Sequence, residues 1–188
     1  MPLSPATARH EIHHRVIDMK AYARDDGMYD VEAHLVDRKP FSTAVFGLKD
    51  PVPAGQPRHD LWVRLTVDDH FFVHDIEAES DVTPYVVCKE ATSTLSKMVG
   101  VQIGAGWSTK VKERLRGSAS CTHLMEMLIP LATTAIQGIG GLNPEKKRAA
   151  LRPDGIPYKL DSCYAYGRSS EVVKMLWPQH FHASPPTP

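Results

Sequence analysis

Arg58-His59-Asp60-Leu61-Trp62-Val63-Arg64-Leu65-Thr66-Val67-Asp68 is the stretch that decides the fold class. Apolar and polar side chains alternate along it: Leu61, Val63, Leu65 and Val67 fall on one side, and Asp60, Trp62, Arg64 and Thr66 on the other. A period of two is typical of a β-strand with one buried face, because successive side chains of a strand point to opposite sides. The stretch therefore predicts a strand at the centre of the sheet-forming half of the chain.

Further strands flank this one. Residues Met28–Asp37 alternate as cleanly, and Arg9–Ala23 alternate more weakly. The turn Arg24-Asp25-Asp26-Gly27 lies between those two runs, and an Asp-Gly pair between alternating runs predicts a hairpin. After the opening stretch, Asp69-His70 predicts a turn and Phe71–Ala78 a returning strand. The first half of the chain therefore predicts about four antiparallel strands, with the Pro-rich residues 39–57 as an irregular connection.

The second half changes to helical periodicity. Thr83-Pro84 predicts the start of a helix that ends at Gly100, and Trp107–Arg116 predicts a short helix. A longer helix is predicted from the Cys121 region to Gln137, with a bend at Pro130. Residues 138–157 predict a loop, and Asp161–Val173 one more strand.

Strands first and helices second predict an α+β domain: an antiparallel sheet from the N-terminal half, with helices of the C-terminal half packed on one face. A length of 188 residues predicts a single domain spanning 1–188, with loose tails at 1–8 and 179–188.

Composition excludes several function classes. The formal net charge is zero, with 22 Lys and Arg against 22 Asp and Glu residues. The protein therefore has no net positive electrostatic potential that would attract nucleic acid or an anionic membrane. The three cysteines, with no CxxC pair, favour a reducing compartment over a disulfide framework or zinc ribbon. With neither a signal-peptide pattern nor a long apolar run, we expect a cytoplasmic protein that acts on a small molecule, as a monomer or a homodimer.

The start of the long helix carries one candidate site. His123 and Glu126 are three residues apart and share a face, and Gln137 continues a polar side that carries no Lys or Arg. Cys121 lies at the helix N-terminus, where unpaired N–H groups stabilise an anion. In one interpretation these side chains line a pocket. In the other, Ser120 or Thr122 simply caps the helix and the polar side has no further role.

The opening stretch carries a second candidate site. His59 lies where the connection enters the strand and could act as an acid–base group, while Asp60, Trp62 and Arg64 project together from one face. Such a face can bind a planar acidic ligand, with Arg64 as a clamp and Trp62 as a stacking wall, or it can simply be solvated.

Three weaker patterns remain. Arg24, in the predicted hairpin turn, either contributes to a binding site or serves the turn alone. His10, His13 and His14 belong to an N-terminal basic cluster, but adjacent strand residues point to opposite faces, which disfavours a shared metal. A zinc site built from His59, Cys121 and His123 suits the ligand types, although the last two are awkwardly spaced for chelation. No cofactor motif is present, and no cofactor is expected.

Several motifs together resemble those of the bacterial family DUF2889. They are Arg24–Gly27, Asp37–Lys39, Gly55–Asp60 leading into Trp62–Asp68, Pro84-Tyr85 with Cys88, Gly104–Trp107, Ser120–Leu124 and Leu160–Tyr166. The resemblance extends over about residues 9–178, and it departs from the family pattern at Ser120, where the family usually has Gly. It adds Tyr164 to the candidate substrate-binding residues. The family resemblance implies an aromatic substrate from bacterial catabolism.

The leading functional hypothesis is a cofactor-independent lyase that eliminates formaldehyde or carboxylate from a phenolic, lignin-derived molecule. His59 or His123 would be the base, and Asp60 or Glu126 would orient it. Arg64 and Trp62, with Arg24, Cys121, Gln137 and Tyr164, would bind the substrate. The alternatives are a metal-dependent hydrolase or lyase using His59, Cys121 and His123, and a non-enzymatic module that binds an aromatic or acyl ligand.

Overall fold

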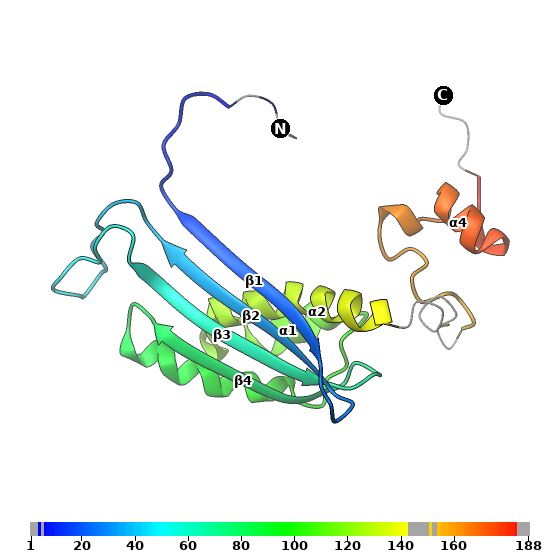
Figure 1. Cartoon of the computed structure of the whole chain (residues 1–188), viewed down its shortest axis with the longest axis horizontal. Coiled ribbons are helices and arrows are strands. Elements are labelled where there is room, and N and C mark those ends of the chain that lie inside the picture. Colours follow the sequence, from blue (N-terminus) through cyan, green and yellow to red (C-terminus); the bar gives the residue numbers. More distant parts are fainter. Residues whose placement is uncertain (1–3, 5, 143–150, 152–153, 184–188) are drawn as a thin grey trace. The chain divides into compact units, whose positions relative to one another are not determined.

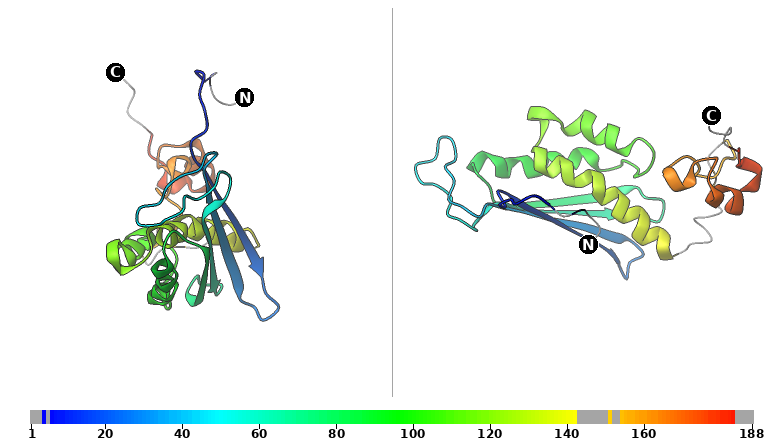
Figure 2. Two further views of the ribbon diagram at one scale, coloured as in Figure 1. Left: turned by 90° about the vertical axis from the view of Figure 1, so that its left-hand side faces the viewer. Right: turned by 90° about the horizontal axis from the view of Figure 1, so that it is seen from above.

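Four strands form one antiparallel sheet in chain order, as the alternation predicted (Figure 1). They are β1 (His14–Ala23), β2 (Tyr29–Arg38), β3 (Pro57–Val67) and β4 (Val73–Val82). The computed structural model describes residues 4, 6–142, 151 and 154–183. The α+β prediction is confirmed, since the helices of the following segment cover one face of this sheet (Figure 2).

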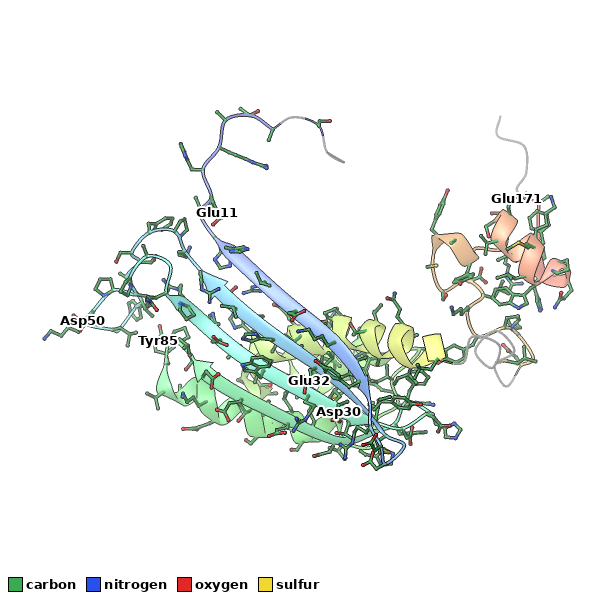
Figure 3. The ribbon with its side chains drawn as sticks, in the orientation of Figure 1. Glu11, Asp30, Glu32, Asp50, Tyr85 and Glu171 are labelled. Carbon is green, nitrogen blue, oxygen red and sulfur yellow. The ribbon has the colours of Figure 1, made fainter. Side chains whose placement is uncertain are left out.

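The inner face of the sheet is the apolar side of the alternation. Across β2 and β3 the register places Ala33 opposite Val63 and Leu35 opposite Leu61, and all four side chains are buried. The outer face is polar and open: Asp30 and Glu32, labelled in Figure 3, lie on it. The period of two therefore separates a buried side from a solvated side along most of β2 and β3.

Three helical segments pack on the inner face: η1 (Val86–Met98), α1 (Trp107–Leu115) and α2 (Thr122–Leu142). Trp107 is buried and donates its indole N–H to the carbonyl oxygen of Leu128, at 2.8 Å. This bond satisfies the polar atom of a core aromatic side chain and ties α1 to α2. The α2 residues buried against the sheet include Leu124, Met127, Leu128, Leu131 and Ala135.

The first of these segments corrects the sequence prediction. It is a 3-10 helix that begins at Val86, after Tyr85, where an α-helix starting at Thr83-Pro84 was predicted. Its sequence is rich in hydroxyl side chains, which bond to carbonyl oxygens three residues earlier, as Thr92 does to Lys89 and Ser96 to Ser93. Such local bonds compete with the α-helical pattern.

Helix α2 is longer than predicted. It continues past Gln137 to Leu142, so the loop prediction is wrong for residues 138–142, while residues 143–150 lie outside the described part of the chain. Pro130 lies inside the helix. No described helix combines the length and the apolar character needed to cross a membrane.

Gly138 marks a close approach of α2 to the sheet. A Cβ atom added there would lie 2.8 Å from the Cβ of Ala21, whereas one added at Gly141 meets nothing within 4 Å. Alanine favours a helix over glycine by up to about 1 kcal/mol. We therefore expect Gly141→Ala to keep or raise the free energy of unfolding, and Gly138→Ala to lower it by about 1–3 kcal/mol through overpacking. Urea unfolding of the two variants tests this, and equal stabilities would contradict the contact.

Residues 142–188 form a second compact unit. Its small core contains Leu160, Val173 and Trp177, and its helical segments are η3 (Tyr164–Tyr166), α4 (Glu171–Leu176) and η4 (Pro178–His180). The strand predicted for Asp161–Val173 is wrong. Ser170 instead caps a helix, because its hydroxyl accepts the backbone N–H of Val173.

Candidate functional site

A buried carboxylate lies at one end of the inner sheet face. Asp37 continues the apolar alternation of β2 beyond Leu35 and is only 1% exposed. The register places Arg15 of β1 and His59 of β3 on either side of it. Arg15 donates from Nε and Nη2 to the two oxygens of Asp37, each at 2.7 Å. A two-point charged pair fixes the orientation of this carboxylate.

Two histidines from different layers of the fold meet at this carboxylate. His59 Nδ1 lies 3.2 Å from Asp37 Oδ2, and His123 Nε2 lies 3.9 Å from the same oxygen. The two imidazole rings have centroids 3.9 Å apart and are tilted by 36°. His59 comes from the start of β3, and His123 from the first turn of α2. The structure thus brings together the two histidines that the sequence singled out separately.

The surroundings of the pair keep Asp37 charged and His59 neutral. Burial raises the pKa of Asp37, but the hydrogen bonds and charge of Arg15 outweigh it and leave that pKa below its usual value. Burial and the neighbouring His123 lower the pKa of His59 to about 4, although Asp37 acts in the opposite direction. At neutral pH, His59 is therefore an unprotonated imidazole beside a carboxylate.

Cys121 extends the group at the helix start. Its Sγ lies 3.8 Å from Nδ1 of His123. Burial raises the pKa of this thiol, but the bond to His123 and the backbone N–H groups of Leu124 and His123 lower it more, so the net pKa is below the usual value. The His123 side chain and the backbone N–H groups at the helix start thus make this thiol easier to ionise, in the direction that the sequence suggested.

Two further groups complete what we call the Asp37 cluster. His13 Nε2 lies 3.3 Å from Asp37 Oδ1, and Glu126 accepts a longer bond, of 3.4 Å, from Nη1 of Arg15. The Glu126 side chain is 47% exposed, so it lies at the rim of the cluster. The cluster consists of His13, Arg15, Asp37, His59, Cys121, His123 and Glu126.

The other candidates from the opening stretch lie on the opposite face of the sheet. Asp60 is bonded to His34, with 2.6 Å between Oδ1 and Nε2, and the His34 ring stacks on Trp62 at 3.6 Å. Arg64 pairs with Glu77 and lies 3.7 Å from Glu32. Asp37, rather than Asp60, is therefore the carboxylate beside His59, because neighbouring strand residues point to opposite sides.

Two predicted substrate-binding residues, Arg24 and Gln137, lie apart from the cluster within the first unit, and Tyr164 belongs to the second unit. Arg24 bonds to Asp26 and Asp30 at the β1–β2 turn, about 26 Å along β2 from Asp37 at roughly 3.3 Å per residue. Gln137 is exposed and lies about 21 Å along α2 from His123 at roughly 1.5 Å per residue. Tyr164 is fully exposed in the second unit.

A shallow hollow lies elsewhere on the first unit. Its volume is about 410 Å³, and it is lined by residues 81–87, Lys89 and, from the β2–β3 connection, Leu48. No residue of the Asp37 cluster lines it. The hollow therefore does not coincide with the chemical groups of the candidate site.

Metal binding was one predicted alternative, and the donor set differs from the prediction. Donor atoms of Asp37, His59 and His123 lie within 4.8 Å of one another. Imidazole and carboxylate are common ligands of transition metals. However, Arg15 already holds both oxygens of Asp37, and a cation there would lie beside the positive guanidinium. The arrangement suits proton transfer better than it suits a metal ion.

Sequence reasoning missed Asp37 and Arg15 as site residues. Asp37 appeared only within the motif Asp37–Lys39, and Arg15 only within the strand predicted at Arg9–Ala23. The two-residue spacing of the strand could have identified Asp37. It follows Val31, Ala33 and Leu35 at steps of two, so its carboxylate lies on the buried face. A charged residue that continues an apolar face needs a partner, and Arg15 supplies it.

The comparisons with known proteins agree with the predicted resemblance. The family model described as "Protein of unknown function (DUF2889)" matches residues 13–137. The match includes the whole Asp37 cluster and ends well before the predicted limit at about residue 178, so it leaves out Tyr164. No curated protein and no solved structure gives a significant match. Because the matched residues make up more than half of the chain, this protein belongs to the DUF2889 family.

Proposed function

We propose that this protein is a lyase that acts on a phenolic small molecule by acid–base chemistry at the Asp37 cluster. The observation that supports the proposal is the contact of His59 with a buried, Arg-bound carboxylate at 3.2 Å. A histidine oriented by a carboxylate is the usual arrangement of a general base. The aromatic class of the substrate rests on the family resemblance alone.

The proposed reaction assigns a proton position to each nitrogen of His59. If Nδ1 of His59 donates to Asp37, the lone pair lies on Nε2, the other ring nitrogen. In the elimination of formaldehyde, Nε2 takes the proton of a CH₂OH group. The O–H electron pair then forms the C=O bond, and the carbon–carbon bond breaks. The His59 imidazolium then gives its proton to the carbanion. The low pKa of His59 favours this proton transfer. Atoms and charge balance without a co-reactant.

The binding roles change from those predicted. Arg15, and not Arg64, is the guanidinium at the cluster, and both of its carboxylate partners come from the cluster itself. We therefore assign Arg15 to the positioning of Asp37. Trp62 and Arg64 lie on the outer sheet face and are not assigned to this substrate site.

The test is turnover on phenolic compounds that carry a CH₂OH or carboxylate side chain, with formaldehyde and the aromatic product measured by mass spectrometry. We expect His59→Ala to reduce kcat/KM by about 10²–10⁴-fold, the usual contribution of a general base. His34→Ala is the matched control, since this histidine also bonds to an aspartate but lies on the outer face. Full activity in both His59→Ala and His123→Ala would contradict the assignment.

Two other measurements separate the remaining hypotheses. Elemental analysis of the purified protein is expected to show no stoichiometric zinc, iron or manganese. A stoichiometric metal that is lost in the His59→Ala variant would support the metal-dependent alternative. Ligand-induced thermal stabilisation with no product would instead indicate a binding module.

A further inference from the structure

Three groups of the Asp37 cluster form a continuous chain of contacts. Cys121 Sγ lies 3.8 Å from Nδ1 of His123, and Nε2 of the same ring lies 3.9 Å from Oδ2 of Asp37. The two ring nitrogens of His123 thus face a thiol on one side and a carboxylate on the other. A nucleophile beside a base, with the base oriented by a third group, is the signature of nucleophilic catalysis.

The backbone around Cys121 adds to this arrangement. The residue immediately precedes the 21-residue helix α2, and backbone N–H groups of His123 and Leu124 bond to its sulfur. These groups stabilise negative charge on the sulfur, and also on an oxygen that forms beside it. Cys121 is half-buried and keeps part of its surface exposed to solvent.

We propose that Cys121 is a nucleophile that adds to the carbonyl carbon of an aldehyde bound at the cluster, with His123 as its base. The thiol proton passes to Nδ1 of His123 as the sulfur–carbon bond forms. The carbon–oxygen π bond breaks, and its electron pair goes to the oxygen, which takes the proton from His123. The product is a hemithioacetal, and no oxidant or leaving group is needed.

This inference rests on the proposed function in one respect: an aldehyde is what the elimination of a CH₂OH group releases. It goes further by giving Cys121 a covalent role. The sequence predicted Cys121 only as a substrate-binding residue or a metal ligand, and the fold sets its Sγ 3.8 Å from Nδ1 of His123, in the first turn of the helix that Cys121 precedes.

The experiment compares thiols within the same chain. Intact protein is treated with limiting iodoacetamide, and the alkylation rates of Cys121 and Cys163 are followed by peptide mass spectrometry from pH 5.5 to 9. Cys163 is the internal control because it is exposed. At pH 7 we expect Cys121 to react roughly tenfold faster than Cys163, because more of it is thiolate. We also expect 4-hydroxybenzaldehyde to protect Cys121 reversibly.

Two variants separate a nucleophilic role from mere accessibility. His123→Ala is expected to remove the rate advantage of Cys121 and to shift its pH profile upward, whereas His34→Ala on the outer face leaves both unchanged. If Cys121 reacts more slowly than Cys163, or keeps its rate in folded His123→Ala protein, the inference is overturned. These measurements need no natural substrate. Failure here, combined with His59-dependent turnover, would therefore remove the nucleophile and leave the lyase proposal standing.

Discussion

Asp37→Asn is expected to lower the free energy of unfolding by about 3 kcal/mol at pH 7. Removal of one member of a buried ion pair typically costs about 3–5 kcal/mol, because the partner is left uncompensated. The Asp37 side chain is 2% exposed, but that of Arg15 is 33% exposed, so water recovers part of the loss. This places the expected value at about the lower end of the range.

Urea unfolding measures this effect, and Asp60→Asn supplies the control. Asp60 lies on the same sheet and also bonds to a histidine, but its side chain is 23% exposed on the outer face. A partly exposed pair typically contributes less than about 1 kcal/mol. If the two asparagine variants unfold at the same urea concentration, Asp37 does not hold the charged centre described above.

Acidification is expected to destabilise the protein between pH 6.5 and 4 through His59. The pKa of this residue is about 4 in the folded protein, against 6.5 for an unperturbed histidine. In that interval the unfolded chain binds a proton that the folded chain does not, so stability rises with pH. The contribution is complete above about pH 6.5 and is lost as the pH falls to 4. It amounts to about 3 kcal/mol, at 1.36 kcal/mol for each pKa unit.

The measurement is urea unfolding at several pH values between 7 and 4, for the natural chain and for His59→Gln. The variant lacks the titrating group, so its stability is expected to fall less steeply in this interval. The contribution of Asp37 to stability is lost only at lower pH. Its pKa is about 3.8 in the unfolded chain and lower in the folded protein, so this loss begins below about pH 3.8. Parallel curves for the two proteins would show that His59 is not the group responsible.

Local pattern predicted most of the sheet. The runs around Val31 and Val63 alternate because each strand has one face on the core. This periodicity can be read from each strand alone, whichever strands it pairs with. The start of η1 and the end of α2 were not predicted. At the start of η1 the Thr83 hydroxyl donates to the carbonyl oxygen of Tyr85, and packing against Ala21 accompanies the end of α2. Both depend on contacts that single-residue propensity does not contain.

The candidate site was predicted in part. His59, His123, Cys121 and Glu126 were named from local features, such as a strand start and a helix N-terminus. Asp60 was wrongly placed as the partner of His59, because adjacency along a strand means opposite faces. The true neighbour, Asp37, lies 22 residues away in the chain.

The sequence by itself determined the class of fold and the types of chemical group available, since hydrophobic periodicity and residue identity are local properties. Only the tertiary structure decided which groups meet. Hairpin register set Arg15, Asp37 and His59 in one row, and the packing of α2 on the inner face brought Cys121 and His123 to the same carboxylate. The burial of Asp37 and the low pKa of His59 follow from that meeting, because desolvation exists only in the assembled core.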